Sequence, residues 1–576
     1  MNYKIRNILF LFISVFLIFN NIPKVIQQNN IGGALLDKLV FYPIFIGLIY
    51  TLYCQCKYKN ILVNFDKFLK FIIVYLVVNC ACLIIGLYNY PYYELIQNHP
   101  ISHIEKLSVI INCLNSFGIY IEDDLLIIIS MFLARIKGIF LDALYTFGGA
   151  YMIYCWYYNN WKMAFKILIK GILISVFIIF CYSTLELFYF TGEEWAKNIL
   201  IIITPYFHSI DVSGSAWENW PPILPPGKQL RSIFAEPSYF GIFAAFCIPF
   251  LWYCINNMKD KIIYTIVFFI IVFFVFLSQA RTATSLLFGE VGLLFLSLVY
   301  FRDKLVIKTV FLVCLSISVA FFSANYFLDN FVDNTSKNGK VENYLDNTSK
   351  NGKVESYLDN TSRNGKVESY LDNTSKNGKV ENYLDNTSKN GKVESYLDNT
   401  SKNGKVESYL DKNFYSVFSD NKRSNSARYA YIKSAFRVGF DNPVFGVGRG
   451  LTAAYMNDYF TAEEIKVQEI QLRLKRQQEL GIFNAGMPIL CEYASKFAET
   501  GIVGCIVYFA PLLYLLHRLL KKLRNLQYEY LFYMISLAGM LASGFSLELT
   551  GSYYYWVLLG LGYAMCFSKE KEEQKV

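Results

Sequence analysis

Long apolar blocks separated by short basic segments constrain this chain more than any other feature of its sequence. The block at residues 262–277 contains 14 Ile, Val, Phe or Leu residues and no charged residue. Each of these side chains favours membrane insertion by about 0.3 to 0.6 kcal/mol, so the block favours it by roughly 4 to 8 kcal/mol. The recurrence of such blocks predicts an all-α fold, a bundle of helices that crosses a membrane many times.

The number of apolar blocks predicts about 12 transmembrane helices, because each crossing needs about 20 residues. The expected helices lie at residues 8–22, 39–54, 71–88, 139–158, 172–190, 239–254, 262–278, 284–300, 306–327, 502–516, 531–547 and 553–567. A further block at 125–134 is too short to cross comfortably. It is expected to be a re-entrant or interfacial piece of an outer loop.

The basic residues of the connecting loops predict the orientation. Clusters of Lys and Arg flank the first helix and recur at 57–70, 162–170, 259–261, 302–304 and 518–524. With an even number of helices all these clusters fall on one side, which the positive-inside rule assigns to the cytoplasm. Both termini are therefore expected to be cytoplasmic.

The same distribution argues against other classes of protein. The net charge of +9 could suggest nucleic-acid binding, but the basic residues lie in short loops next to apolar blocks, so no nucleic-acid partner is expected. Most of the 13 Cys lie within apolar runs, and there are only four His. Neither a metal site nor another cofactor is expected.

The predicted topology divides the chain into three parts. Residues 1–327 form a membrane domain with the first nine helices, 328–501 form a long outer (periplasmic) loop, and 502–576 form the last three helices and a cytoplasmic tail. The loop contains six copies of a 13-residue repeat, DNTSKNGKVESYL with small variations, at 333–410. Thirteen residues do not fill whole helical turns, so successive copies do not align on one face. This low-complexity repeat favours a solvated spacer over a ligand-binding array.

Four polar motifs lie at the outer ends of the predicted helices. They are RSIFAEPSYFG at 231–241, LSQARTAT at 277–284, SARYAYIKSAFRVGFDNPVFGVGRG at 426–450 and ETGIVG at 499–504. In this order and on one side of the membrane, they resemble the O-antigen polymerase/O-antigen ligase family of bacterial envelope proteins.

The resemblance implies a glycosyltransferase of the bacterial inner membrane. Members of that family use undecaprenyl-pyrophosphate-linked oligosaccharides at the outer face of this membrane. Polymerases join the repeat units into a surface polysaccharide such as O-antigen, capsule or exopolysaccharide, and ligases move the finished chain to the lipid A core. Membrane lipid, a chain-length regulator and other glycan-assembly proteins are the implied partners.

The chemistry of a diphosphate leaving group identifies the candidate residues. Arginine is permanently charged and can bind phosphate oxygens with two parallel hydrogen bonds. Arg231, Arg428 and Arg449 are therefore expected to bind the pyrophosphate or glycan. Arg281 is expected to be catalytic, because it can stabilise the charge that develops on the leaving group. Arginines at helix ends can also simply reach for the membrane interface.

Two carboxylates are the expected catalytic bases for the acceptor hydroxyl. Glu236 and Glu499 both lie at predicted helix starts. Either could instead compensate the positive end of the helix dipole.

Two alternatives to a metal-independent polymerase remain open. The ligase branch is expected to carry a functional His in the long outer loop, but residues 328–501 contain none. A flippase or other transporter for lipid-linked oligosaccharides can also have about 12 helices. Transporters, however, usually place polar groups at mid-membrane, whereas this chain collects them at the outer ends.

Overall fold

The computed structural model describes residues 2–19, 36, 38–58, 61–97, 111–113, 115–118, 120, 122–208, 221–225, 228–332, 423–482, 485–523 and 527–567. All regular elements within these residues are helices, and no strand occurs among them. The predicted all-α fold is confirmed. The tandem repeat at 333–410 lies outside the described residues.

Six helices of the described part are long and apolar enough to cross a membrane. They are α4 (Phe65–Tyr88), α9 (Trp161–Phe190), α11 (Pro237–Asn257), α13 (Arg281–Phe301), α14 (Lys304–Phe327) with its extension η4 (Leu328–Val332), and α25 (Glu492–Leu523). The other predicted segments overlap shorter helices, namely α1 (Tyr3–Phe16), α3 (Phe41–Tyr58), α8 (Gly149–Tyr157), α12 (Lys261–Leu277), α26 (Tyr528–Ser543) and α27 (Tyr553–Phe567). Each predicted segment thus overlaps a helix, and a total of 12 crossings stays a prediction.

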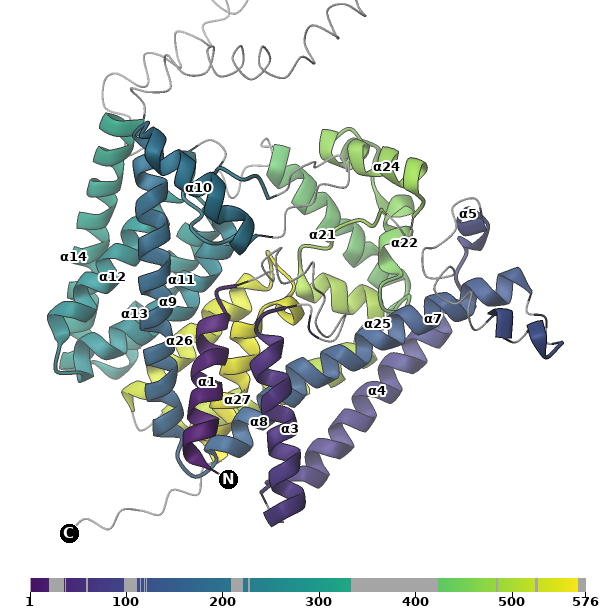
Figure 1. Ribbon diagram of the computed structural model, residues 1–576, viewed down its shortest axis with the longest axis horizontal. Coiled ribbons are helices and arrows are strands. Elements are labelled where there is room, and N and C mark those ends of the chain that lie inside the picture. The colour runs from purple at the N-terminus through teal and green to yellow at the C-terminus, as the bar shows by residue number, and fades with distance from the viewer. Residues whose placement is uncertain are drawn as a thin grey trace, which may run out of the picture.

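The short apolar block at 125–134 forms the first half of α7 (Asp123–Asp142). This helix continues without a turn through the π-helical η2 (Ala143–Gly148) into α8. It packs along α4, as Figure 1 shows. The block is therefore part of a longer helix rather than a separate short one.

Helix α11 is the centre of one half of the bundle. It is apolar on all sides and buried along almost its whole length, which is typical of a helix surrounded by other helices. It packs against α12, α13 and α26, while α14 covers α12 and α1 covers α9. In Figure 1 this half lies to the left, and α4, α7 and α25 lie to the right.

Hydrogen bonds join the loops that carry the basic clusters at one end of the bundle. Asn2 N donates to Tyr50 Oη at 2.9 Å, and Tyr157 Oη donates to Asn7 Oδ1 at 3.0 Å. On the other half, Tyr528 Oη donates to Asp303 Oδ1 at 2.9 Å. We call this end the basic face. These bonds place the N-terminal segment beside α3 and α8 and the 302–304 loop beside α26, and a common side for all the basic loops stays a prediction.

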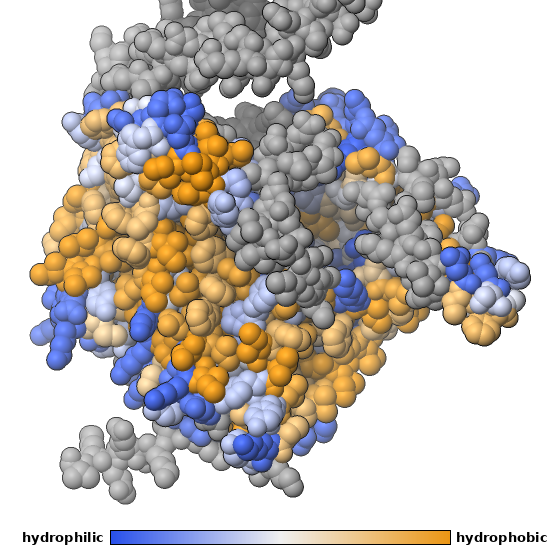
Figure 2. Space-filling model, viewed as in Figure 1, coloured by the Kyte–Doolittle hydropathy of each residue, from blue (hydrophilic) through white to orange (hydrophobic). Residues whose placement is uncertain are grey.

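A cap of helices covers the opposite end of α25. It consists of α21 (Arg423–Asp441), α22 (Thr452–Tyr459), α23 (Ala462–Ile465) and α24 (Gln468–Leu480) (Figure 1). The short elements α5 (Tyr93–Gln97), α10 (Glu194–Phe207) and η6 (Leu549–Gly551) complete the described structure. Figure 2 shows apolar side chains along the flank of the bundle and hydrophilic ones over α24 and at the lower edge. This is the surface expected of a protein whose flank faces lipid.

Candidate active site

A glycine-rich loop at 446–450, the glycine loop, fills a break in α25. The backbone of α25 is not helical at Gly501, where φ is 59° and ψ is −163°. Carbonyl groups freed by this break accept hydrogen bonds from the loop: Val447 N lies 2.9 Å from Ala498 O, and Gly448 N lies 2.9 Å from Glu499 O. The break is stabilised because its backbone groups keep partners.

The glycine loop can lie here only because three of its five residues, and the facing residue on α4, are glycines. Gly446, Gly448 and Gly450 have φ values of +65°, +94° and +72°, a region that residues with a Cβ rarely adopt. A Cβ on Gly86 of α4 would come within 2.1 Å of Val447 O. The loop is therefore held tightly between α4 and α25.

This loop presents Arg449 to Asp142, the last residue of α7. The two side chains form an ion pair and are 18% and 20% exposed. Burial disfavours the charge on Arg449, but the Asp142 carboxylate outweighs it and raises the pKa of Arg449 above its usual range. Arg449 therefore stays charged in a largely enclosed position.

Glu499 ties the glycine loop to the first segment of α25. Its Oε1 accepts a hydrogen bond from Gly450 N at 2.8 Å, and its Oε2 lies 3.5 Å from Lys496 Nζ. Lys496 also lies 3.9 Å from Glu492 Oε1 one turn earlier. Arg135 of α7 completes the group, because its guanidinium lies 2.8 Å from where a Cβ of Gly450 would be. These charges largely compensate one another.

A second group of charged residues consists of Arg281, Arg428 and Glu236. Its net charge is positive, whereas the charges of the first group, around Arg449 and Lys496, largely balance. Arg281 begins α13, and Arg428 lies on α21, close enough for the two charges to repel each other. Tyr239 interacts electrostatically with Arg428 and with Glu236, the residue that precedes α11. Glu236 accepts a hydrogen bond from Ser238 Oγ at 3.0 Å. Three distant parts of the chain thus bring two arginines and a carboxylate together.

Glu548 connects the two groups. It precedes η6 and interacts electrostatically with Tyr239 of the second group and with Lys496 and Arg449 of the first. Its side chain is exposed, yet desolvation by the surrounding protein and repulsion by Glu492 raise its pKa to about 7.

Arg231 lies in a separate, fully buried cluster with a 1% exposed side chain. Its guanidinium donates to the carbonyl oxygens of Pro222 and Ile223, the latter at 3.0 Å, and its Nε lies 4.0 Å from Glu186 Oε1. Glu186 Oε2 in turn accepts hydrogen bonds from the backbone N–H groups of Arg231 and Ser232 at 3.1 and 2.8 Å. This cluster fixes the segment that leads to Glu236.

Of the six residues expected from the sequence, five lie close enough to influence one another electrostatically, directly or through Tyr239 and Glu548, and Arg231 lies apart. The residues that sequence reasoning missed are Arg135, Asp142, Glu186, Glu492, Lys496 and Glu548. Asp142 and Glu186 are acidic residues inside predicted membrane segments, which is a usable signal of function. Lys496 and its two partners follow helical spacing. Glu548 carries no such signal.

One comparison with known proteins supports the resemblance. A family model described as O-antigen ligase matches residues 266–479, from α12 to α24. No curated protein and no solved structure matches the chain.

Proposed function

Since this chain carries an O-antigen ligase-family domain at residues 266–479, we propose that it is a lipid-linked oligosaccharide polymerase. It joins undecaprenyl-pyrophosphate-linked repeat units into a surface polysaccharide at the outer face of the bacterial inner membrane. The family itself comprises membrane enzymes of glycosyl transfer. The choice of polymerase within it is our proposal.

The observation that carries the proposal is the pair formed by Arg281 and Arg428. Two guanidinium groups that repel each other, with Arg281 partly desolvated, form a favourable site for a dianion. The N-terminus of α13, where Arg281 lies, adds the positive end of a helix dipole. As the sugar leaves, a diphosphate bound between them gains negative charge, which the two guanidinium groups would stabilise.

The reaction needs one broken bond, one new bond and one proton acceptor. The bond between the anomeric carbon and the phosphate oxygen breaks, and its electron pair leaves with the lipid diphosphate. The acceptor hydroxyl oxygen bonds to that carbon, and its proton goes to a carboxylate. Glu548 suits this step because its pKa of about 7 allows it to accept a proton at neutral pH. Glu236, oriented by Ser238, would accept a hydrogen bond from the acceptor sugar.

The other candidates support this centre. We assign Arg449 and Glu499 to holding the glycine loop against α25, with Arg449 also attracting the negatively charged donor. Arg231 acts as a positioning residue, because its donors are engaged by backbone carbonyls of the segment before Glu236.

The test is chain growth by purified enzyme supplied with lipid-linked repeat units. Arg281→Ala and Arg428→Ala should each reduce the rate by about 10²- to 10³-fold, the usual effect of removing one group that stabilises a developing anion. Lys433→Ala, an exposed cation on the same helix as Arg428, is the matched control and should retain the normal rate. Equal rates in all three variants would refute the assignment of the diphosphate site.

The ligase is the second candidate, because the matching family model is described as O-antigen ligase. Gene deletion in the native host separates the two. Loss of a polymerase leaves surface glycans of a single repeat unit, whereas loss of a ligase leaves long glycans on the undecaprenyl carrier and none attached to lipid A.

A further inference from the structure

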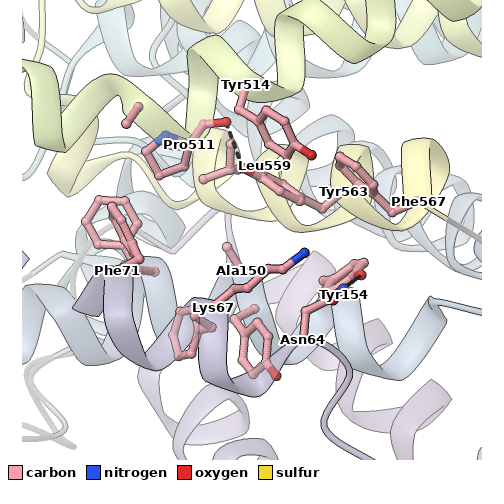
Figure 3. A pocket seen from close by; sticks show the side chains of 14 residues that line it. Asn64, Lys67, Phe71, Ala150, Tyr154, Pro511, Tyr514, Leu559, Tyr563 and Phe567 are labelled. Carbon is pink, nitrogen blue, oxygen red and sulfur yellow. Dashed lines mark hydrogen bonds between the residues drawn. The ribbon is translucent and has the colours of Figure 1, made fainter. Parts of the chain in front are cut away.

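A second candidate binding site lies near the basic face. It is a cavity of about 340 Å³ between four helices: α4 and α8 form one wall, and α25 and α27 form the other (Figure 3). Its walls are apolar and rich in aromatic rings, including Phe68, Phe71, Tyr514 and Tyr563. A cavity with such walls binds a hydrocarbon chain better than a polar solute.

Aromatic rings close the end of the cavity that faces the candidate active site. Phe147 lines the cavity, and its ring centroid lies 5.0 Å from that of Tyr75 and 6.0 Å from that of Tyr508. Lys496 of the candidate active site also lies over the Tyr508 ring, 5.3 Å from its centroid. The cavity therefore does not continue into the charged centre, and its occupant enters from elsewhere.

Two cations lie at the other end, near the basic face. Lys67 lines the cavity, and Figure 3 shows its side chain extending between the two walls. Arg518 is exposed one turn after Tyr514, with its guanidinium carbon 5.6 Å from the centroid of that ring and 5.3 Å from that of Phe567. Both rings line the cavity. Positive charge thus flanks the entrance from two different helices.

The dimensions agree with a lipid of the membrane leaflet opposite to the active site. Lys67 precedes Gly86, which contacts the glycine loop, by 19 residues of the same helix. At about 1.5 Å per residue this is about 28 Å, close to the hydrocarbon thickness of a bilayer. The charge distribution assigns Lys67 and Arg518 to the cytoplasmic side.

We propose that this cavity binds one acyl chain of an anionic phospholipid from the cytoplasmic leaflet, with its phosphate headgroup held by Lys67 and Arg518. Asn64 fixes the wall at this entrance, because its Nδ2 donates to Tyr154 Oη at 3.0 Å. The site is independent of the proposed reaction. A bound lipid would fill the space between α4 and α25, the two helices that hold the glycine loop.

Photo-cross-linking of the purified full-length protein tests this inference. A photoactivatable phosphatidylglycerol should label peptides of α4 around Lys67 and of α25 around Tyr514. The double variant Lys67→Glu/Arg518→Glu should reduce this labelling at least fivefold. Lys166→Glu, an exposed lysine of α9 on the same face, is the control and should label normally.

A second variant tests the contribution of the cavity to lipid binding while leaving Lys67 and Arg518 unchanged. Ala510 is exposed and lines the cavity, so Ala510→Trp should fill it and abolish labelling while the protein elutes normally in size-exclusion chromatography. The proposal fails if the charge reversals have no effect, or if a phosphatidylcholine probe labels these peptides equally well. Stronger labelling by a polyprenyl diphosphate probe would also overturn it, because the cavity would then belong to the donor substrate.

Discussion

Arg428 and Arg449 lie only 21 residues apart in the sequence, but their surroundings differ. Arg449 is ion-paired with Asp142, whereas Arg428 lies beside another cation, Arg281. From residue type alone, the sequence predicted that both bind the pyrophosphate or glycan. It could not distinguish them, because the distinction depends on partners that are far away in sequence.

The pKa of Glu548 leads to a prediction about pH dependence. Because the pKa is raised to about 7, the carboxyl is protonated below that pH and can accept a proton only above it. The rate of chain growth should therefore rise about tenfold per pH unit below pH 7 and level off above it. Rates measured from pH 5 to 9 test this.

In the variant Glu548→Gln the rate should fall at least 100-fold and should no longer rise with pH below pH 7. Glu236→Gln should lower the rate but keep its rise with pH. If Glu548→Gln keeps both rate and profile, the proton acceptor is another group.

The ion pair between Arg449 and Asp142 leads to a prediction about stability. Asp142→Asn should destabilise the protein by about 1 to 3 kcal/mol, because it leaves Arg449 largely enclosed without its counter-charge. The double variant Asp142→Asn/Arg449→Gln should recover part of this loss, since neither charge remains. Thermal unfolding in detergent measures both, and equal losses in the single and double variants would argue against the pair.

At the scale of elements, the apolar pattern predicted helices well, and the glycine loop shows what it could not predict. Every predicted apolar segment overlaps a helix, because burial in lipid and helical hydrogen bonding favour the same structure. The break of α25 at Gly501 and the insertion of the glycine loop depend instead on close contact between distant backbones. The glycine spacing indicated that the backbone at 446–450 packs closely against another element, but it did not indicate that this element is α25.

Gly450→Ala should therefore disturb the site more than an ordinary helix substitution. A Cβ there is strained at φ +72° and would lie 2.8 Å from the guanidinium of Arg135. The expected cost is about 1 to 3 kcal/mol, with a large loss of chain growth.

Gly289→Ala on α13 is the control for this substitution, because no atom lies within 4 Å of its would-be Cβ. Alanine in a helix is favoured over glycine by about 0.5 to 1 kcal/mol, so this variant should be neutral or slightly more stable. Similar melting temperatures for the two variants would show that the glycine loop is not tightly held.

At the scale of the whole molecule, the candidate site is assembled from widely separated segments around α25. Arg281, Arg428 and Glu548 come from α13, the cap and the turn before α27. The sequence predicted that polar groups would meet at the outer ends of the helices. Asp142 and Lys496 were missed although each carried a signal: the first is an acidic residue in an apolar run, and the second has carboxylate partners at helical spacing.

Deletion of residues 333–410 should leave chain growth intact within about twofold. The repeat is expected to be a spacer, and residues 411–422 can still span about 40 Å when extended. Glycan length on gels, with wild-type and deleted proteins at equal abundance, measures the effect. Loss of activity in a well-folded deletion variant would assign the repeat a direct role.

The break of α25 also has a consequence for biogenesis. The glycine loop is synthesised before α25, and its hydrogen-bonding partners at Ala498 and Glu499 do not exist until that helix emerges. A nascent chain that stops short of Gly501 therefore holds Arg428 and Arg449 but lacks the backbone partners of the glycine loop. Nonsense mutations before Gly501 should be as damaging as early ones, and the segment from α25 to the C-terminus should determine when the enzyme matures.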